Sequence, residues 1–154
     1  METCIIRQAR VADSNDVCNL AFALLSELYP GMYTADQLRP VTERILRKSG
    51  SVFPFIGFID NRPSGLMVLN RCTAIYALGD FGEISELFVA PAHRSSGLGA
   101  RLIEKAVEFA RSKGWTMLEV GAPDPSKWQR TVDFYLHNGF VEVGPRLYRS
   151  FVDV

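Results

Sequence analysis

The feature that most constrains the fold of this chain is a pair of glycines, Gly97 and Gly99, directly before a long run with helical periodicity. A strand-like segment, GEISELFVA, precedes the pair, so the chain reads here as strand, loop and helix. The helix carries one apolar face, formed by Leu102, Ile103, Ala106, Val107 and Ala110. Because a glycine inside a helix costs about 1 kcal/mol relative to alanine, two glycines at its start indicate that something approaches the backbone closely there.

A phosphate group is the expected ligand at this helix start. The first N–H groups of a helix have no intrahelical acceptor, the helix dipole is positive at that end, and Arg94 adds a positive charge. The glycines could instead serve only a tight strand-to-helix turn, and their spacing alone does not decide between the two. Leu102 stands where a dinucleotide fingerprint needs its third glycine, and no G-K-[ST] sequence is present, so those two motifs are excluded.

Periodicity along the rest of the chain predicts a mixed α/β protein of the α+β type. The predicted helices cover 13–29, with Asp13 or Ser14 as N-cap, then 34–48, a segment from about Gly97, and 125–137. The predicted strands cover 4–9, 51–60, 64–78, 82–90 and 115–122, followed by two short strands within 139–151 around Gly144 and Pro145. An NRP turn joins 51–60 to 64–78 as an antiparallel hairpin, and one crossover is parallel, so the sheet is expected to be mixed.

Composition narrows the class of protein. The chain has 154 residues, 47% of them hydrophobic, which suits one domain with its own core. Lys plus Arg equal Asp plus Glu at 17 each, which argues against nucleic acid as a partner. Charges interrupt the first twenty residues, so we expect no signal peptide or membrane span and a cytoplasmic location. Cys4, Cys18 and Cys72 are far apart, so neither disulfides nor a metal site are expected, and Cys18 is placed in the core.

The loop resembles the R-x-x-G-x-G loop of the GNAT (Gcn5-related) N-acetyltransferases, matched here by Arg94, Gly97 and Gly99. The segment ISELFVAPAHR looks like the fourth strand of that family, and TVDFYLHNGF looks like its F-Y-x-x-x-G-F segment. The opening IIRQARVADSNDV is similar to the family's first strand and helix entry. The resemblance implies one domain over residues 1–154 with the GNAT acyl-CoA N-acyltransferase fold, in which helices cover both faces of a mixed sheet of about seven strands.

The resemblance also implies an enzyme that moves an acetyl group from acetyl-CoA directly to a primary amine of a small molecule or peptide. The residues expected to bind acetyl-CoA are Leu87, Phe88, Val89, Arg94, Ser95, Ser96, Gly97, Leu98, Gly99, Ala100 and Trp128. Two of them depart from the family pattern, because Ser95 stands where a glycine is common and Trp128 where an asparagine is frequent. The pantetheine arm would then be held by the Trp128 ring or by Gln129.

Three residues are candidates for the chemistry. An amine with a pKa near 10.4 costs about 4 to 5 kcal/mol to deprotonate at pH 7, so a base is needed. Glu83 and Glu86 are the carboxylates on the strand before the loop; they point to opposite faces unless a bulge intervenes, which the family usually has. We favour Glu86, with Glu83 or water as alternatives, and a backbone N–H near Phe88 or Val89 for the thioester oxygen. Tyr135 matches the family's tyrosine acid.

The acceptor is expected between the first two helices and the last hairpin. Tyr29, Met32, Tyr33 and Tyr148 are the candidate contacts, together with Glu27, Arg146 and Arg149, a mixture that selects no single amine. A homodimer is left open, and His93 and His137 receive no role. The alternative to an enzyme is a domain that binds acetyl-CoA without turnover, as a sensor or an assembly subunit, and a third reading is a structural module whose glycines only shape a turn.

Overall fold

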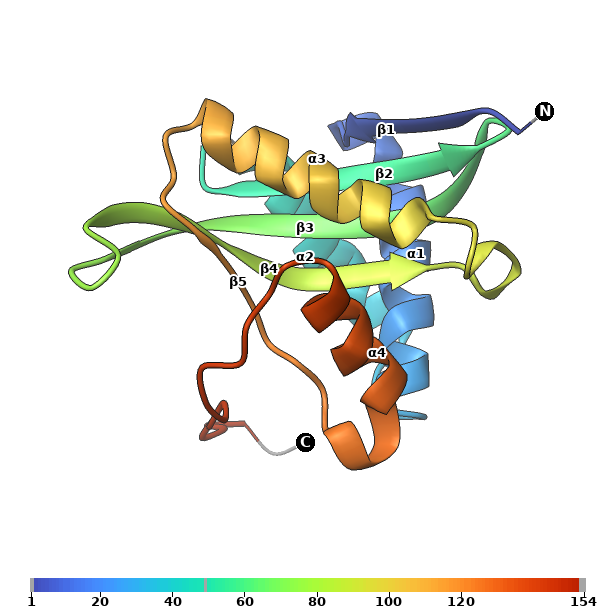
Figure 1. Ribbon diagram of the computed structural model, residues 1–154. Helices are drawn as coiled ribbons and strands as arrows, with labels where there is room; N and C mark the ends of the chain where they lie inside the picture. The colour runs from blue at the N-terminus through green and yellow to red at the C-terminus, as the bar shows by residue number, and fades with distance from the viewer. Residues whose placement is uncertain (1, 49, 153–154) are drawn as a thin grey trace.

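A five-stranded sheet forms the centre of the computed structural model, which describes residues 2–48 and 50–152 (Figure 1). Its strands, in spatial and chain order, are β1 (Cys4–Gln8), β2 (Val52–Ile59), β3 (Arg62–Ala74), β4 (Gly79–Val89) and β5 (Leu118–Val120). The first four pair antiparallel, and β5 pairs parallel with β4. The mixed sheet predicted from the sequence is therefore confirmed.

Four helices cover the two faces of this sheet. They are α1 (Ser14–Leu28), α2 (Ala35–Arg47), α3 (Leu98–Ser112) and α4 (Pro125–His137), with two short 3-10 turns at Val11–Asp13 and Pro91–His93. Figure 1 shows α3 on one face, α1 and α2 on the other, and α4 beside the open end of β4. The predicted bounds of α4 are those observed, and both ends of α1 and α2 and the start of α3 agree with the predictions to within one residue.

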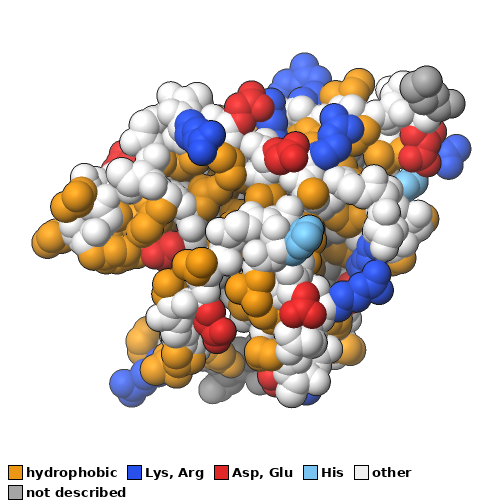
Figure 2. Space-filling model, in the orientation of Figure 1, with side chains coloured by type: hydrophobic (Ala, Val, Ile, Leu, Met, Phe, Trp, Pro, Cys, Tyr) orange, Lys and Arg blue, Asp and Glu red, His pale blue; other side chains and the backbone are white. Residues whose placement is uncertain are grey.

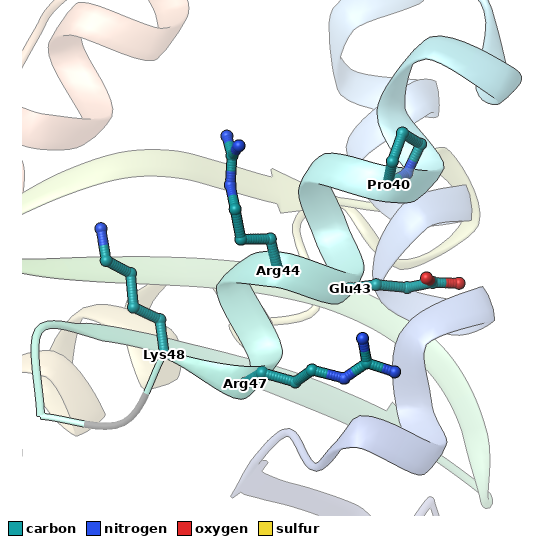
Figure 3. Close-up of a pocket in the computed structure, with 5 residues that line it drawn as sticks. All are labelled: Pro40, Glu43, Arg44, Arg47 and Lys48. Atoms are coloured by element: carbon teal, nitrogen blue, oxygen red, sulfur yellow. The ribbon is translucent and has the colours of Figure 1, made fainter.

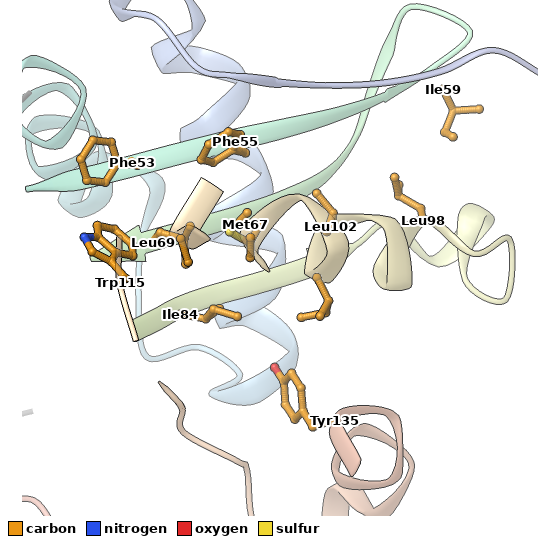
Figure 4. Packing of buried hydrophobic residues seen from close by; sticks show 13 residues of the cluster. Phe53, Phe55, Ile59, Met67, Leu69, Ile84, Leu98, Leu102, Trp115 and Tyr135 are labelled. Carbon is orange, nitrogen blue, oxygen red and sulfur yellow. The ribbon is translucent and has the colours of Figure 1, made fainter. Parts of the chain in front are cut away.

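The core lies in two layers, one on each face. Under α3, the sheet buries side chains such as Phe55, Met67 and Leu69 against Leu102 and Ala106 (Figure 4). Under α1, Val17 and Leu20 pack on Ile56, Leu66 and Phe88. Cys18 is 2% exposed, which confirms its predicted burial. Trp115 is also buried, and Phe134 packs against the first layer.

The antiparallel hairpin predicted for β2 and β3 is present, although its turn begins one residue before the predicted NRP segment, and Arg62 and Pro63 belong to β3. Its two turn residues, Asp60 and Asn61, have φ of 47° and 64°, and Ile59 pairs with Arg62 across the turn. Two successive left-handed residues are characteristic of the tight turn that matches the twist of paired strands, and Asp and Asn tolerate that backbone better than other side chains.

The expectation of about seven strands is wrong for the described residues, which form five. The two strands expected within 139–151 are absent, and residues 141–150 are exposed and without regular structure. Gly144 has a φ of 136°, which breaks the extended run, and Pro145 next to it has no N–H to donate to a ladder. Strand β5 is also shorter than the predicted 115–122, so it offers little edge for a further strand to join.

Candidate active site

The start of α3 is open toward the loop that follows β4. Gly97, the N-cap of α3, has a φ of 88°, and no heavy atom lies within 4 Å of the position its Cβ would take. The first intrahelical bond runs from the N–H of Arg101 to the carbonyl of Gly97 at 3.1 Å. The N–H groups of Leu98, Gly99 and Ala100 therefore have no helical acceptor, and the space beside Gly97 is open, which together fit an anionic group such as a phosphate.

Gly99 has a different reason to be a glycine. A Cβ at this position would lie 3.1 Å from Cζ of Phe134 on α4, tighter than nearly all real contacts. Gly99 thus lets α4 pack closely on the first turn of α3. The two glycines were expected to serve one purpose, but Gly97 has a backbone role and Gly99 a packing role.

Leu98, between the two glycines, fixes the start of α3 on the sheet. Gly57 and Gly65 face each other across β2 and β3, and a Cβ on either would come within 2.9 Å and 3.1 Å of a methyl of Leu98. Leu98 itself is 1% exposed. This pair of glycines therefore forms a shallow seat in the sheet that sets the position of the loop.

Arg94 joins the loop to α1. Its Nη2 donates to both carboxylate oxygens of Glu27 at 2.7 and 2.8 Å, and its Nε donates to the carbonyl of Val89 at 3.0 Å. The guanidinium also lies over the ring of Phe88, 5.7 Å from its centre. The residue expected to face a pyrophosphate is thus paired with a carboxylate of α1, Glu27, which was itself predicted to contact the acceptor.

Ser95 occupies a left-handed conformation, with a φ of 68°. This is the region that glycine adopts freely, which explains why a glycine is the ordinary residue at a position of this kind. The hydroxyl of Ser95 accepts a hydrogen bond from Nη2 of Arg130 on α4 at 3.3 Å. The hydroxyl of Ser96 donates to the carbonyl of His93, so both serines stabilise the turn.

Strands β4 and β5 separate at the site. Their pairing ends at Ile84 and Val120, while β4 continues to Val89 bonded only to β3. The N–H of Ala90 donates to Ser64 on the β3 side, so by alternation the N–H of Phe88 faces β3 and those of Leu87 and Val89 face the gap. Of the two N–H groups considered from sequence, Val89 is the one directed toward the space between the strands.

A β-bulge at Ser85 brings Glu83 and Glu86 to the same face of the sheet. Glu86 pairs with Val68, Ile84 pairs with Leu69, and Ser85 is the extra residue between them. Ile84 and Leu87 both belong to the core layer under α3, so the two glutamates face the side of α1 and α2. The bulge that the family resemblance implied is therefore present.

The two glutamates have different surroundings. Glu83 accepts a hydrogen bond at 3.0 Å from Nη2 of Arg146 in the C-terminal segment, which pairs its charge. Burial raises the pKa of Glu86, the hydrogen bond from Ser85 lowers it, and the negative charge of Glu83 raises it further. Glu86 has no cationic partner among the described residues. It is therefore the better placed of the two to accept a proton.

Tyr135 lies on α4 and points its hydroxyl toward the sheet (Figure 4). The side chain is 8% exposed, and its ring packs against Phe134 and Phe140. Burial raises the pKa of Tyr135 to about 12. Within residues 2–48 and 50–152 its hydroxyl has no hydrogen-bond partner, so the proton is free to be donated to a group that enters beside it.

The remaining candidate residues lie in three places: on α4, between α1 and α2, and in the C-terminal segment. Trp128 is half-buried at a kink in α4, where its φ and ψ of −130° and 38° are not helical. Tyr29, Met32 and Tyr33 lie together between α1 and α2, with the two tyrosine rings 6.2 Å apart at 63°. Tyr148, 92% exposed, lies in the C-terminal segment and makes none of the described aromatic contacts.

Two polar residues beside Glu86 were not among the candidates from sequence. The amide of Asn70 on β3 donates to Oγ of Ser85 at 2.8 Å, and the hydroxyl of Ser85 donates to the carboxylate of Glu86. The only sequence signal for them was a hydroxyl residue between two acidic positions of one strand, which becomes informative once the bulge is known.

Two further surface features lie away from this site. A shallow hollow of about 410 Å³ lies on α2, lined by Pro40, Glu43, Arg44, Arg47 and Lys48 (Figure 3), separate from the loop after β4. Apolar side chains gather at the tip of the β3–β4 hairpin, where Ile75 and Leu78 are exposed (Figure 2). In the described part of the chain, no three His, Cys, Asp or Glu side chains could share a metal ion, and no helix could cross a membrane.

Comparison with known proteins gives one consistent result. The family model described as "Acetyltransferase (GNAT) family" matches residues 19–140. An IAA acetyltransferase of Azospirillum brasilense is 28% identical over 88% of this chain and 86% of its own length. An uncharacterized N-acetyltransferase of Methanocaldococcus jannaschii is 31% identical over 90 residues, which are 57% of this chain and 38% of that protein. The structure of aminoglycoside N-acetyltransferase AAC(6')-Iy with CoA superposes with a TM-score of 0.79 at 19% identity, covering 99% and 97% of the two chains.

Proposed function

The chain belongs to the acetyltransferase (GNAT) family, and from that premise we propose that it transfers the acetyl group of acetyl-CoA to a primary amine. The observation that carries the proposal is the junction of β4 and α3. There the open N-terminus of α3 adjoins the stretch of β4 that β5 leaves unpaired, with Glu86 and Tyr135 on elements that border it. CoA bound to the AAC(6')-Iy structure, which has the same fold, agrees with this choice of cosubstrate.

The residues of the loop would hold the cosubstrate. The N–H groups of Leu98, Gly99 and Ala100 are available for its phosphates, and Trp128 lies at the kink of α4, two residues before Arg130, which donates to Ser95 of the loop. Acetyl-CoA supplies an acetyl group activated as a thioester. Ser95 and Ser96 shape the turn, and Leu87, Phe88 and Val89 provide the strand along which the pantetheine arm would lie.

Three groups of this chain would then act on the acceptor and on the reacting atoms. The carboxylate of Glu86 accepts the proton of the acceptor ammonium, so that a neutral amine can attack. The N–H of Val89 donates a hydrogen bond to the thioester oxygen as its negative charge grows. Tyr135 donates its proton to the departing sulfur, and its raised pKa keeps it protonated at neutral pH until that moment.

The acceptor is proposed as an amine of a small molecule or a peptide. We propose that it enters between α1, α2 and the C-terminal segment, where the rings of Tyr29, Tyr33 and Tyr148 and the Glu83–Arg146 pair would contact it. Aromatic rings and a carboxylate suit a cationic amine. The solved relative AAC(6')-Iy is an aminoglycoside N-acetyltransferase, so aminoglycosides belong in the first panel of acceptors, beside amino acids and short peptides.

Thermal unfolding with CoA and acetyl-CoA tests the cosubstrate directly. A ligand at 100 times its dissociation constant adds about 2.7 kcal/mol of stability, so the melting temperature should rise. Gly97→Glu should abolish this rise because a negative side chain enters the open space at the start of α3. Gly97→Ala is the matched control, since it loses about 1 kcal/mol from the left-handed backbone and adds no charge. A wild-type protein that millimolar CoA does not stabilise would refute the proposal.

Thiol release over the amine panel then separates an enzyme from a binding module. Stabilisation by acetyl-CoA with no acetylated product from any acceptor would favour the sensor or assembly subunit that the departure at Trp128 leaves open. Product formation that depends on both acetyl-CoA and the amine supports the transferase.

Location and oligomeric state extend the proposal. A cytoplasmic location is supported by three unpaired cysteines, because such thiols persist in a reducing compartment. A homodimer is supported by large exposed apolar side chains in the C-terminal segment, among them Leu147 and Phe151. Light scattering on the purified protein measures the oligomeric state, and fractionation of the producing cell measures the location.

A further inference from the structure

We propose that Ser85 and Asn70 are positioning residues for Glu86, forming a hydrogen-bonded chain that orients its carboxylate toward the acceptor. The inference rests on the proposed function, because it assigns these side chains a role in the proton transfer to Glu86. It goes beyond that function, since neither residue contacts the reacting atoms.

The bulge makes the chain of hydrogen bonds possible. Successive residues of a regular strand point to opposite faces, so Ser85 could not normally reach the side chain of Glu86. Because Ser85 is the extra residue opposite Val68 and Leu69, it turns to the same face as Glu86. Its hydroxyl donates to Oε2 of Glu86.

Asn70 fixes the direction of that hydroxyl. Its Nδ2 donates to Oγ of Ser85 at 2.8 Å from the neighbouring strand, where Asn70 pairs with Glu83. An oxygen that accepts from Asn70 must direct its own proton elsewhere, and the carboxylate of Glu86 is within reach. Each group therefore donates to the next one: the amide of Asn70 to the hydroxyl of Ser85, and that hydroxyl to the carboxylate of Glu86.

This series of hydrogen bonds leaves Oε1, the second carboxylate oxygen of Glu86, free. Ser85 contacts Oε2 alone, and no described hydrogen bond ends on Oε1. A carboxylate held at one oxygen presents the other in a defined direction, which is what a base requires in order to meet a proton. Without Ser85 the carboxyl group would rotate freely and lose a donor that favours its charged form.

The charged groups around Glu86 set the direction of the expected pH effect. They are Glu83 on the same strand, Glu119 opposite Glu83 on β5, Arg146 of the C-terminal segment, and the Arg94–Glu27 pair between the loop and α1. Burial and Glu83 raise the pKa of Glu86, and the Ser85 hydrogen bond opposes them. Removing that hydrogen bond therefore moves the midpoint of Glu86 to higher pH, so activity is lost first at the acidic end.

Ser85→Ala and Asn70→Ala test the proposal by their pH profiles. For Ser85→Ala we expect kcat/KM at pH 6 to fall by about 3- to 10-fold while the value at pH 9 stays near wild type. Asn70→Ala should move the acidic limb in the same direction by less. Ser85→Thr keeps the hydroxyl and should restore the wild-type profile. Thr73→Val, which removes a hydroxyl–carboxylate bond to Asp80 elsewhere on the same two strands, is the control.

An NMR titration of the Glu86 carboxyl in the unliganded protein separates this inference from the proposed function. The midpoint of Glu86 could be higher in Ser85→Ala while the wild type shows no acetyl transfer. That result would support the hydrogen bonds from Asn70 and Ser85 to Glu86 and refute their catalytic purpose. Superimposable titrations and rate profiles of wild type, Ser85→Ala and Asn70→Ala would overturn the inference while leaving the transferase intact. A uniform loss of activity at every pH would also overturn it, since that is the effect of a merely structural role.

Discussion

At the scale of single residues, Tyr135 offers a clean separation of chemistry from packing. The ring fills a place between Phe134 and Phe140, while the hydroxyl has no partner in the described part of the chain. Tyr135→Phe should therefore preserve the fold and CoA affinity but lower single-turnover acetyl transfer by about 100-fold or more, because the proton donor is lost.

The comparison with Tyr135→Ala gives the control. Truncation of a buried aromatic ring leaves a cavity that costs about 3 to 5 kcal/mol, which a melting curve detects. A Tyr135→Phe protein with full single-turnover activity would assign the proton to water and leave Tyr135 only its packing role.

At the scale of elements, the seat formed by Gly57 and Gly65 couples the sheet to the loop. Gly57→Ala places a methyl 2.9 Å from Cδ1 of Leu98, and Leu98 has no exposed side toward which to move. We expect a loss of about 1 to 3 kcal/mol in unfolding free energy and weaker CoA binding, because the start of α3 is displaced.

A double-mutant cycle measures this coupling. Leu98→Ala alone opens a cavity under α3, yet in combination with Gly57→Ala it removes the clash, so the double variant should be more stable than the sum of the two single effects. Strict additivity in denaturant unfolding would show that Gly57 and Leu98 do not constrain each other.

The entry to α1 depends on a pair of charged residues. Asp13 accepts two hydrogen bonds from Arg7 at 2.8 and 2.9 Å and one from the N–H of Arg10 at 2.7 Å. The hydrogen bonds from Arg7 are the main reason why the pKa of Asp13 falls from 3.8 to about 2, opposed by burial. The interaction ties the end of β1 to the turn before α1.

This pair predicts an acid-dependent loss of stability. Because the folded pKa lies below the unfolded one, the stabilisation is complete above about pH 5 and disappears as the pH falls toward 2, by about 1 to 2 kcal/mol. Asp13→Asn should flatten that part of the stability curve measured by denaturant unfolding. Asp36→Asn, which breaks an exposed pair with Arg39, should leave it unchanged.

At the scale of the whole molecule, local patterns predicted the elements well where periodicity and caps agree. The bounds of α4 follow from Asp124 as N-cap, whose side chain accepts from Ser126, and Pro125 at the first position. The position of Glu86 did not follow from local pattern, because the bulge at Ser85 depends on the register of β3 and β4. The role of Gly99 likewise depends on α4, which is remote in sequence.

In the C-terminal segment, local pattern predicted strands that the structure does not contain. Alternating apolar residues in 139–151 indicated strands, but a strand also needs a neighbour with a free edge, and β5 provides three residues. Sequence pattern describes which face a segment could bury and does not state whether a partner exists. The start of α3 at Gly97 was predictable from local sequence alone, and whether its free N–H groups bind a phosphate stays a prediction.

The last prediction concerns this segment as a whole. A variant ending at Glu142 keeps Phe140 on Tyr135 and removes side chains that are mostly exposed, with the Arg146–Glu83 pair as the main contact. Exposed ion pairs contribute about 0 to 1 kcal/mol, so the melting temperature should change by only a few degrees, and stabilisation by CoA should persist. Acetyl transfer should fall by about 10-fold or more, because the truncation removes Tyr148 and Arg146, which are proposed to contact the acceptor. A melting temperature lowered by about 10 °C or more would contradict a monomer with this segment exposed and show that the segment is paired in solution, as a dimer through it would require. Light scattering would then distinguish pairing with the chain's own sheet from exchange with a second copy, since only the exchanged form loses its dimer on truncation.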